Sequence, residues 1–392
     1  MATVTSYTLA ETGDTAFSAR IVRREGQLPS DSRKPVGPAT RTPMAREPGE
    51  TLRVFVYGAR GYTGRLILAQ AEGRLDVIRA ARGPRSPEEP DCIALDLDDR
   101  DALRAALHGQ AVLLNCAGPF SETWRPLVDA CLETRTHYLD LCAEWAVFEA
   151  LSALDAEARA RGVMLLPGVG FDVVASDCLA AHVARRLPGA RRLEIGIAGL
   201  ELVSRGSART ILELVGEPVR VRRGGAIVAD PHLREAIFDF GRGPRRAYAV
   251  SWADVSTAWH TTGIPDIAVY FEGTPVVAGL ALAERSFGWM LRTPLLKRLA
   301  RLQAELLPEG PAPHQRAGRR AVLVARVEDA SGARAESRLV TPEAYTFTAH
   351  AAVAVAQRVL AGAARPGFCT PALLLGPDFV LTLEGIERTD LP

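Results

Sequence analysis

A short apolar run that ends in three evenly spaced glycines constrains this chain more than any other feature. Residues 53–57 are typical of a β-strand, and Gly58, Gly61 and Gly64 follow just before a helical pattern begins. This order of strand, glycine turn and helix is typical of a dinucleotide-phosphate site. Gly58 permits the tight turn, Gly61 lets the pyrophosphate approach the backbone, and Gly64 lets the helix pack closely.

The residues inside and after this turn predict which nucleotide binds. Arg60, Tyr62 and Thr63 occupy the turn and the first helical residues, where free N–H groups and the helix dipole favour an anion. The second predicted strand, 76–81, ends at Arg82, where an NAD site usually has Asp or Glu. A guanidinium can hold a 2′-phosphate through two N–H groups, so we expect NADP(H). A solvated loop arginine would give the same pattern.

Two further segments are expected beside the cofactor. Asp96 ends the third predicted strand and could bond the adenine or cap that region. The run 111–120 is apolar until it breaks, which is typical of a central parallel strand buried on both faces. Ligands of open α/β sheets bind at the carboxyl ends of such strands. The residues expected under the nicotinamide ribose are Asn115, Ala117, Gly118 and Pro119, although Gly118-Pro119 could be a strand terminator alone.

Composition narrows the functional classes. The 392 residues carry a net charge of +1, so nothing indicates a nucleic-acid partner. The six cysteines form no CxxC pair, and neither a disulfide framework nor a metal site is expected. The chain has no apolar stretch of about 18 residues and no apolar signal core at its N-terminus. These features predict a cytoplasmic enzyme.

Changes in pattern predict the domain organisation. Residues 1–50 are rich in Thr, Ser, Pro, Gly and Arg without sustained periodicity, which predicts a disordered N-terminal arm. Strands and helices alternate over 51–175, the expected nucleotide-binding domain. Strand-like runs with few long helices dominate 176–344, which predicts a second, α+β domain built on a mixed or antiparallel sheet. The segment 218–228 is predicted as one strand and 176–186 as a helix.

Eight short motifs occur along the chain in a specific order, at 58–64, 115–120, 136–140, 167–172, 204–208, 262–266, 310–311 and 367–372. Together they resemble the saccharopine dehydrogenase-like superfamily of NAD(P)-dependent oxidoreductases, and most closely its trans-acting enoyl reductase branch. The resemblance implies an α/β fold with a Rossmann-like parallel sheet domain, which residues 345–392 complete, and a second domain that carries the substrate. The segments 142–144 and 175–177 depart from the family pattern and leave the substrate open.

The leading functional hypothesis is an NADP(H)-dependent enoyl reductase that reduces a C=C bond of a lipid or polyketide intermediate. Its substrate would be a small molecule or an acyl chain, which a carrier protein could present. The alternative is a saccharopine-type imine reductase or amino-acid dehydrogenase, which needs clustered arginines for carboxylates. Arg205 and Arg209 are the only obvious pair. A second alternative is a catalytically silent nucleotide-binding or membrane-associated scaffold.

Three residues are candidates for catalysis. Tyr138 could donate a proton to the carbon beside the hydride acceptor, with Asp140 orienting it, but a satisfied buried pair is equally consistent. Asp172 follows two glycines and is either an acid near the cofactor or the N-cap of the next helix, and the cap is preferred. His260 is a weaker candidate. The turn at 262–266 is expected to close the crevice over the substrate.

The sequence allows two interpretations for each of two other segments. Residues 204–207 could hold an anion by their N–H groups or simply begin a helix. Residues 294–307 predict a basic amphipathic helix, preceded by Phe287 and Trp289. Such a helix can lie on a membrane surface, but covering a core or forming a subunit contact, as in a homodimer, is the preferred interpretation.

Overall fold

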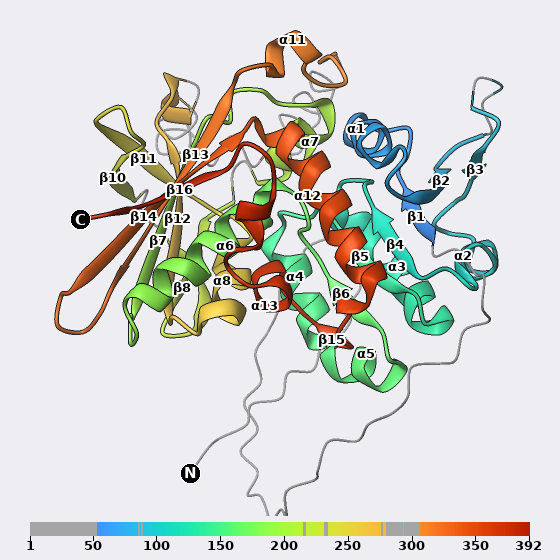
Figure 1. Ribbon diagram of the computed structural model, residues 1–392, viewed down its shortest axis with the longest axis horizontal. Helices are drawn as coiled ribbons and strands as arrows, with labels where there is room; N and C mark the ends of the chain where they lie inside the picture. The colour runs from blue at the N-terminus through green and yellow to red at the C-terminus, as the bar shows by residue number, and fades with distance from the viewer. Residues whose placement is uncertain are drawn as a thin grey trace, which may run out of the picture. The chain divides into compact units, whose positions relative to one another are not determined.

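Two β-sheets organise the part of the chain that the computed structural model describes, which is residues 53–84, 87, 89–214, 217–230, 234–275, 277–279, 293 and 306–392. Helices pack between and around the two sheets (Figure 1). The predicted N-terminal arm at 1–50 lies outside the described residues. Of the predicted amphipathic helix at 294–307, only Leu306 and Leu307 lie inside them.

The first sheet is parallel throughout, with strand order β15-β6-β5-β4-β1-β2-β3. Its strands are β1 (Arg53–Tyr57), β2 (Asp76–Ala81), β3 (Cys92–Ala94), β4 (Val112–Asn115), β5 (His137–Asp140), β6 (Met164–Leu166) and β15 (Gly367–Phe368). This confirms the predicted Rossmann-like sheet. The carboxyl ends of β1, β4, β5 and β6 share one edge of the sheet, because the strands are adjacent and parallel.

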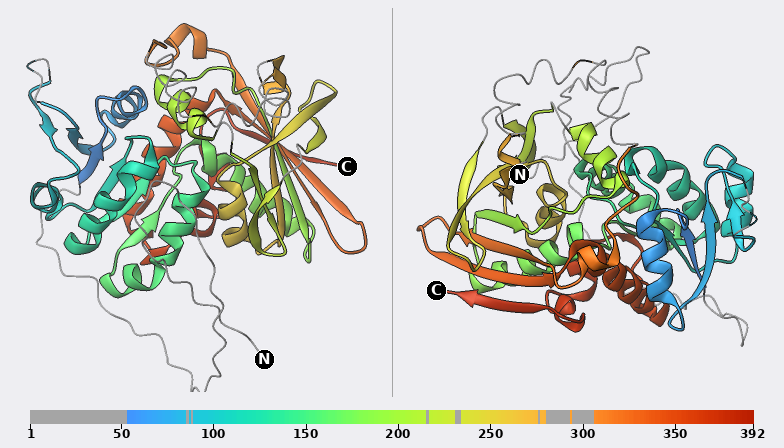
Figure 2. Two further views of the ribbon diagram at one scale, coloured as in Figure 1. Left: turned by 180° about the vertical axis from the view of Figure 1, so that it is seen from behind. Right: turned by 90° about the horizontal axis from the view of Figure 1, so that it is seen from above.

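Helices cover both faces of the first sheet because its strands are apolar on both sides. On β1, Val54 and Val56 face a core that includes α1 (Tyr62–Ala71) and α12 (Ala344–Arg358). Phe55 and Tyr57 point the other way, into a core with α2 (Arg100–Leu107), α3 (Phe120–Thr134), α4 (Trp145–Ala153) and α5 (Asp155–Arg161). Figure 2 shows α12 lying along α1.

The second sheet is mixed, as predicted, with strand order β10-β11-β12-β7-β13-β14-β16 and a hairpin, β8-β9, that pairs with β12. Only β12 and β7 pair in parallel among its described strands. Their bounds are β7 (Arg192–Ala198), β8 (Val219–Arg223), β9 (Ala226–Asp230), β10 (Glu235–Asp239), β11 (Pro244–Val250), β12 (Asp266–Glu272), β13 (Arg320–Glu328), β14 (Arg334–Pro342) and β16 (Glu387–Leu391).

Helix α6 (Phe171–Arg186) joins the two sheets. It is buried on nearly every side, and it packs on β13 and β14 as well as on α12 and on α8 (Asp254–Thr262). Its first turn follows β6 directly, so it carries the chain from the edge of the first sheet onto the second. The remaining helical segments are α7 (Arg205–Leu214), α11 (Pro313–Arg316), α13 (Pro371–Leu375), the π-helical turn Val359–Ala363 and the 3-10 turn Phe379–Thr382.

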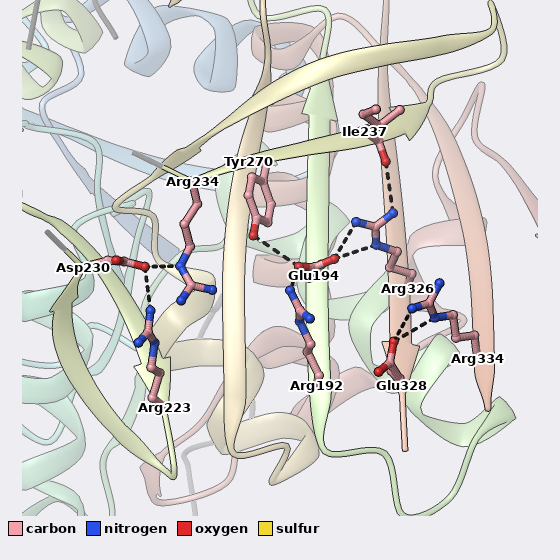
Figure 3. A network of polar contacts seen from close by, with 10 residues as sticks. All are labelled: Arg192, Glu194, Arg223, Asp230, Arg234, Ile237, Tyr270, Arg326, Glu328 and Arg334. Atoms are coloured by element: carbon pink, nitrogen blue, oxygen red, sulfur yellow. Dashed lines mark hydrogen bonds and ion pairs between the residues drawn. The ribbon is translucent and has the colours of Figure 1, made fainter. Parts of the chain in front are cut away.

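The face of the second sheet that points away from α6 carries a network of polar contacts (Figure 3). Glu194 of β7 accepts hydrogen bonds from Arg326 (2.6 Å) and Tyr270 (3.2 Å), and it pairs with Arg192. Burial alone would raise the pKa of Glu194, but Arg326 and Arg192 bring it below its ordinary value. A charge can lie in this sheet because its partners neutralise it.

The C-terminal residues divide between the sheets. β15 pairs with β6 and α12 packs on α1, both in the predicted first domain. β16 instead pairs with β14 in the second sheet, although the prediction placed all of 345–392 with the first domain. Other local predictions were also wrong. The single strand at 218–228 is a hairpin turned by Gly224 and Gly225, both with positive φ. The helix predicted at 176–186 begins at Phe171.

Candidate functional site

The glycine turn after β1 has the geometry that its sequence predicted. Gly58 adopts a φ of +85°, and a Cβ there would lie 2.8 Å from the backbone nitrogen of Ala117. A Cβ on Gly64 would lie 2.3 Å from the carbonyl oxygen of Gly58. Side chains at either position would therefore force the turn, the helix and the end of β4 apart.

The first turn of α1 has no side-chain cap. Gly61 is its N-cap and provides no side-chain cap, so the N–H groups of the first turn, which include those of Tyr62 and Thr63, have no side-chain acceptor from the cap. A Cβ at Gly61 would approach only the carbonyl oxygen of Gly58, at 3.2 Å. Uncapped N–H groups beside a residue without a side chain fit a pyrophosphate.

Arg82 follows β2 and Asp96 follows β3, so both lie on the same side of β1 in the first sheet. Both act on the Tyr57 hydroxyl, whose pKa burial raises to about 12, while Arg82 lowers it and Asp96 raises it. Both side chains are exposed, and Arg82 has no hydrogen bond or ion pair within the described residues. A free guanidinium at this position fits the predicted 2′-phosphate contact. Asp96 accepts a hydrogen bond from the N–H of Asp98 (3.2 Å) and so is partly engaged.

Arg60 is held more firmly than the sequence suggested. Its Nε donates to Glu89 (2.9 Å) and its Nη1 to the carbonyl of Pro84 (2.8 Å). It also lines a cavity of about 570 Å³ between α1 and strands β2 and β3, together with Arg65, Arg79 and Cys92. Arg60 therefore ties the glycine turn to the segment between β2 and β3, beside the place expected for the adenosine.

A second turn meets the glycine turn at the end of β4. Asn115 is fully buried, and its side-chain oxygen accepts the N–H of Ala117 (3.0 Å), which shapes the turn before the cis Gly118-Pro119 bond. Glu144 then caps α3, because its carboxylate accepts the N–H groups of Phe120 and Ser121 at 2.8 Å each. The sequence indicated only that residues 142–144 depart from the family pattern. The capping role of Glu144 becomes visible only in the fold.

Tyr138 and Asp140 form a buried, satisfied pair. The Tyr138 hydroxyl donates to Asp140 (2.9 Å) and accepts from the Asn115 amide (3.3 Å), and neither residue is exposed. Asp140 also accepts the N–H groups of Cys142 (2.9 Å) and Gly168 (2.8 Å), and burial raises its pKa to about 6. Through these hydrogen bonds Asp140 connects the loop after β5 to the loop after β6. Proton donation by Tyr138 stays a prediction.

Asp172 has the features of an acid that can exchange a proton. It is not the N-cap that was preferred, because Gly170 is the N-cap of α6 and Asp172 lies in the first turn. Its side chain is partly exposed and has no hydrogen bond within the described residues, and burial raises its pKa to about 7. The indole of Trp252 donates to its backbone carbonyl (3.1 Å), which brings the second sheet's loop to this turn.

Elements from the second half of the chain cover the glycine turn. The Tyr62 hydroxyl donates to the carbonyl of Pro311 (2.6 Å), and its ring packs edge-on against Tyr345 at 5.2 Å. Arg205 donates to the carbonyl of Leu307 from both Nε (2.9 Å) and Nη2 (2.7 Å). The segment 307–311 therefore bridges α1 and α7. Ser204 caps α7 by accepting the N–H of Ser207 (3.1 Å), which favours the helix-start interpretation of 204–207.

The turn at 262–266 contacts the second sheet, and its closing over the substrate stays a prediction. Asp266 accepts the N–H of Gly224 (2.8 Å) and holds the β8-β9 hairpin. His260 lies within α8, 3.9 Å from Glu149 and edge-on to Phe368 at 4.9 Å. Burial lowers the pKa of His260, which keeps its ring neutral. These contacts give His260 a packing position between α4 and β15.

The described part of the chain brings no three His, Cys, Asp or Glu side chains together as metal ligands would. All six cysteines are free thiols. No helix among the described residues combines the length and the apolar character needed to cross a membrane.

Comparisons with known proteins place the nucleotide-binding region. Residues 54–166 match the family model described as saccharopine dehydrogenase NADP binding domain. A trans-acting enoyl reductase of Mycobacterium leprae is 28% identical over 222 residues, which cover 49% of this chain and 52% of that protein. A saccharopine dehydrogenase-like oxidoreductase of Mus musculus is 26% identical over 163 residues, 35% of this chain and 38% of that protein. The matches thus span about half or less of these curated relatives.

A solved structure extends the likeness to the whole fold. Saccharopine dehydrogenase (L-Glu forming) from Saccharomyces cerevisiae superposes with a TM-score of 0.55 at 13% identity. The superposition covers 87% of this chain and 100% of that chain. At this identity the likeness concerns the arrangement of the two sheets and not the chemistry.

Proposed function

We propose that this chain, whose residues 54–166 are a saccharopine dehydrogenase NADP-binding domain, is an NADPH-dependent enoyl reductase. The single observation that carries the proposal is Asp172, an unpartnered and partly exposed acid beside the ends of the strands where the nicotinamide would lie. Its pKa of about 7 lets it hold a proton at neutral pH and release it during reaction.

The chain's own residues would hold the cofactor along the edge of the first sheet. The open first turn of α1 would bind the pyrophosphate, and Arg82 the 2′-phosphate. The Asn115-oriented turn at 117–119 would support the nicotinamide ribose. When bound, NADPH supplies a hydride from its nicotinamide ring.

Reduction of a conjugated C=C bond needs a hydride at the β-carbon and a proton at the α-carbon. As the new C–H bond forms at the β-carbon, the π pair moves toward the carbonyl and leaves an enolate. Asp172 then gives its proton to the α-carbon and is left as a carboxylate, which water reprotonates. The substrate gains two electrons, and NADPH is oxidised to NADP⁺. Burial favours the neutral acid in the resting state.

The arginines weigh against the imine alternative. A dicarboxylic imine needs free guanidinium groups, but the Nε and Nη2 groups of Arg205 already donate hydrogen bonds to the carbonyl of Leu307. Arg209 is likewise engaged and not free. Similarity to trans-acting enoyl reductases also supports C=C reduction, with an acyl thioester as the substrate, free or on a carrier protein.

Isotope labelling tests the proposal. The protein is incubated with nicotinamide-4-deuterated NADPH and an enoyl thioester, offered both as the CoA and as the carrier-protein conjugate. We expect NADPH oxidation and one deuterium at the β-carbon of the saturated product. A parallel reaction in D₂O with unlabelled NADPH should place deuterium at the α-carbon. Oxidation of NADPH only with a mixture of an oxo acid and an amino acid would favour the imine reductase instead.

A further inference from the structure

Tyr345 joins three elements at the covered side of the glycine turn. Its hydroxyl oxygen accepts the N–H of Ser204 at 2.7 Å and lies 2.9 Å from the hydroxyl of Ser207. The Ser207 and Ser204 hydroxyls lie 3.1 Å apart. These contacts form a chain of three hydroxyl groups at the start of α7, of which the phenol of Tyr345 is one end.

One of the three hydroxyl protons has no acceptor among these three hydroxyl groups. Three hydroxyls carry three O–H protons, but only two contacts join them, and the N–H groups of Ser204 and Ser207 fill acceptor positions rather than consuming protons. One O–H must therefore point to an acceptor outside the chain. Either hydroxyl can be the donor in each of these contacts, and in the order Ser204 to Ser207 to Tyr345 the free proton is on Tyr345.

Helix α12 brings this phenol near the start of α6, where the charge of Asp172 also acts on it. Thr348 lies one turn after Tyr345 on the same face of α12, and its hydroxyl accepts the N–H of Phe171 at 3.1 Å. Phe171 immediately precedes Asp172. On its other side the Tyr345 ring packs on Tyr62, the first residue of α1. The hydroxyl therefore lies between the glycine turn and the acid proposed to protonate the substrate.

We propose that Tyr345 is a catalytic residue, which donates a hydrogen bond to the carbonyl oxygen of the enoyl thioester. This inference rests on the proposed function. Hydride addition at the β-carbon sends the π pair onto that oxygen, and a donor that is already oriented stabilises the negative charge as it develops. Asp172 then protonates the α-carbon, the pair returns from the oxygen, and the carbonyl reforms. The phenol proton is shared with the oxygen but never transferred.

The test removes one oxygen atom. Tyr345→Phe is compared with Tyr270→Phe, which removes another buried phenol, on the second sheet, where the hydroxyl contacts Glu194 at 3.2 Å. We expect Tyr345→Phe to lower kcat on an enoyl thioester by about 10²-fold or more, the usual cost of losing one such donor. KM and the NADPH dissociation constant, from fluorescence titration, should change less than about threefold, because the ground-state carbonyl gains little from the donor.

Two further measurements separate catalysis from packing. Ser207→Ala leaves the phenol but removes the neighbour that orients it, so we expect a smaller loss in kcat, about tenfold. The fall in rate as pH rises through about 7, due to Asp172, should persist in Tyr345→Phe. A variant that instead loses NADPH binding, or whose melting temperature alone falls while kcat is kept, would overturn the inference in favour of a packing role.

The two proposals fail differently. If the parent protein reduces the enoyl thioester and Tyr345→Phe turns over at the same rate, the catalytic role of Tyr345 is wrong and the proposed function stands. If the parent binds NADPH but reduces no enoyl thioester, the proposed function is wrong and this inference falls with it.

Discussion

The buried acids of this protein differ in how their carboxylates are held, and that difference assigns their roles. Asp140 and Asp177 accept hydrogen bonds from backbone N–H groups and tie loops together. Asp254 is fully buried without a hydrogen bond of good geometry among the described residues. Asp172 alone of the four is partly exposed, so it alone can meet a substrate.

Asp172→Asn tests this role. The amide keeps the shape but has no acidic proton, so we expect kcat on an enoyl thioester to fall by about 10²-fold or more. The sign of the pH dependence follows from the raised pKa of about 7. The active acid is present below that pH, and kcat/KM should fall with increasing pH above it. A pH–rate profile of the parent and of the variant measures both. An unchanged profile in the variant would exclude Asp172 as the proton donor.

Arg82 carries the prediction about the cofactor. Arg82→Ala should weaken NADPH binding by at least tenfold, about 1.4 kcal/mol, because the guanidinium has no hydrogen bond or ion pair among the described residues and would face the 2′-phosphate. NADH binding should not change. Fluorescence titration with both nucleotides gives the two dissociation constants. Equal affinity of the parent for NADH and NADPH would contradict this role.

At the scale of elements, the glycine turn couples α1 to the end of β4. The would-be methyl groups at Gly58 and Gly64 meet backbone atoms, which cannot rotate away as a side chain can. The turn therefore keeps α1 close enough for its first N–H groups to reach a phosphate, and the same closeness positions the turn at 117–119.

Gly64→Ala tests the coupling. Its methyl would lie 2.3 Å from the carbonyl oxygen of Gly58, so α1 must shift, and we expect a loss of about 2 kcal/mol or more in stability and a strongly weakened NADPH affinity. Gly206→Ala in α7 is the matched control. Its methyl meets only the Ser204 hydroxyl at 3.8 Å, and alanine favours a helix over glycine by about 1 kcal/mol. In chemical denaturation, the free energy of unfolding of Gly206→Ala should equal or exceed that of the parent protein.

At the scale of the whole molecule, the C-terminal residues bind the two sheets together. α12 packs between α1 and α6, β15 extends the first sheet beside β6, and β16 extends the second beside β14. The buried side chains of α12 include Phe347, Val353 and Val355. Neither sheet is complete without residues from this end of the chain.

A truncation after residue 344 should therefore fail to fold. Removing α12 uncovers the apolar faces of α1 and α6, and we expect the product to be insoluble or to melt without cooperativity. A milder truncation after residue 385 removes β16 and should keep NADPH binding, because β16 pairs with β14 and its other printed contacts are with the end of α6 and with residues 377–378, not with the first sheet. Circular dichroism and NADPH titration compare the two. A soluble 1–344 fragment that binds NADPH would refute this arrangement.

The sequence alone determined the features that depend on neighbours in the chain. The glycine spacing, the parallel strands and the places where they end follow from local pattern, so residues 58–64 and 115–119 could be proposed as cofactor contacts before the fold was known. The strand β16 was missed because its residues are mostly polar. The β8-β9 segment was predicted as one strand because its turn at Gly224 and Gly225 was not recognised.

Only the tertiary structure decided which groups meet across the crevice. Tyr345 and Ser204 are 141 residues apart, and Tyr62 and Pro311 are 249 apart, so no spacing in the sequence reveals their contact. The same holds for Arg205, which looked free in the sequence and is bound to Leu307. Hydrogen bonds depend on distances of a few tenths of an ångström, and the packing of α6, α7 and α12 sets those distances. The sequence thus determined the glycine turn proposed to bind the nucleotide, and the packing decided that Asp172 and Tyr345 lie near the starts of α6 and α7.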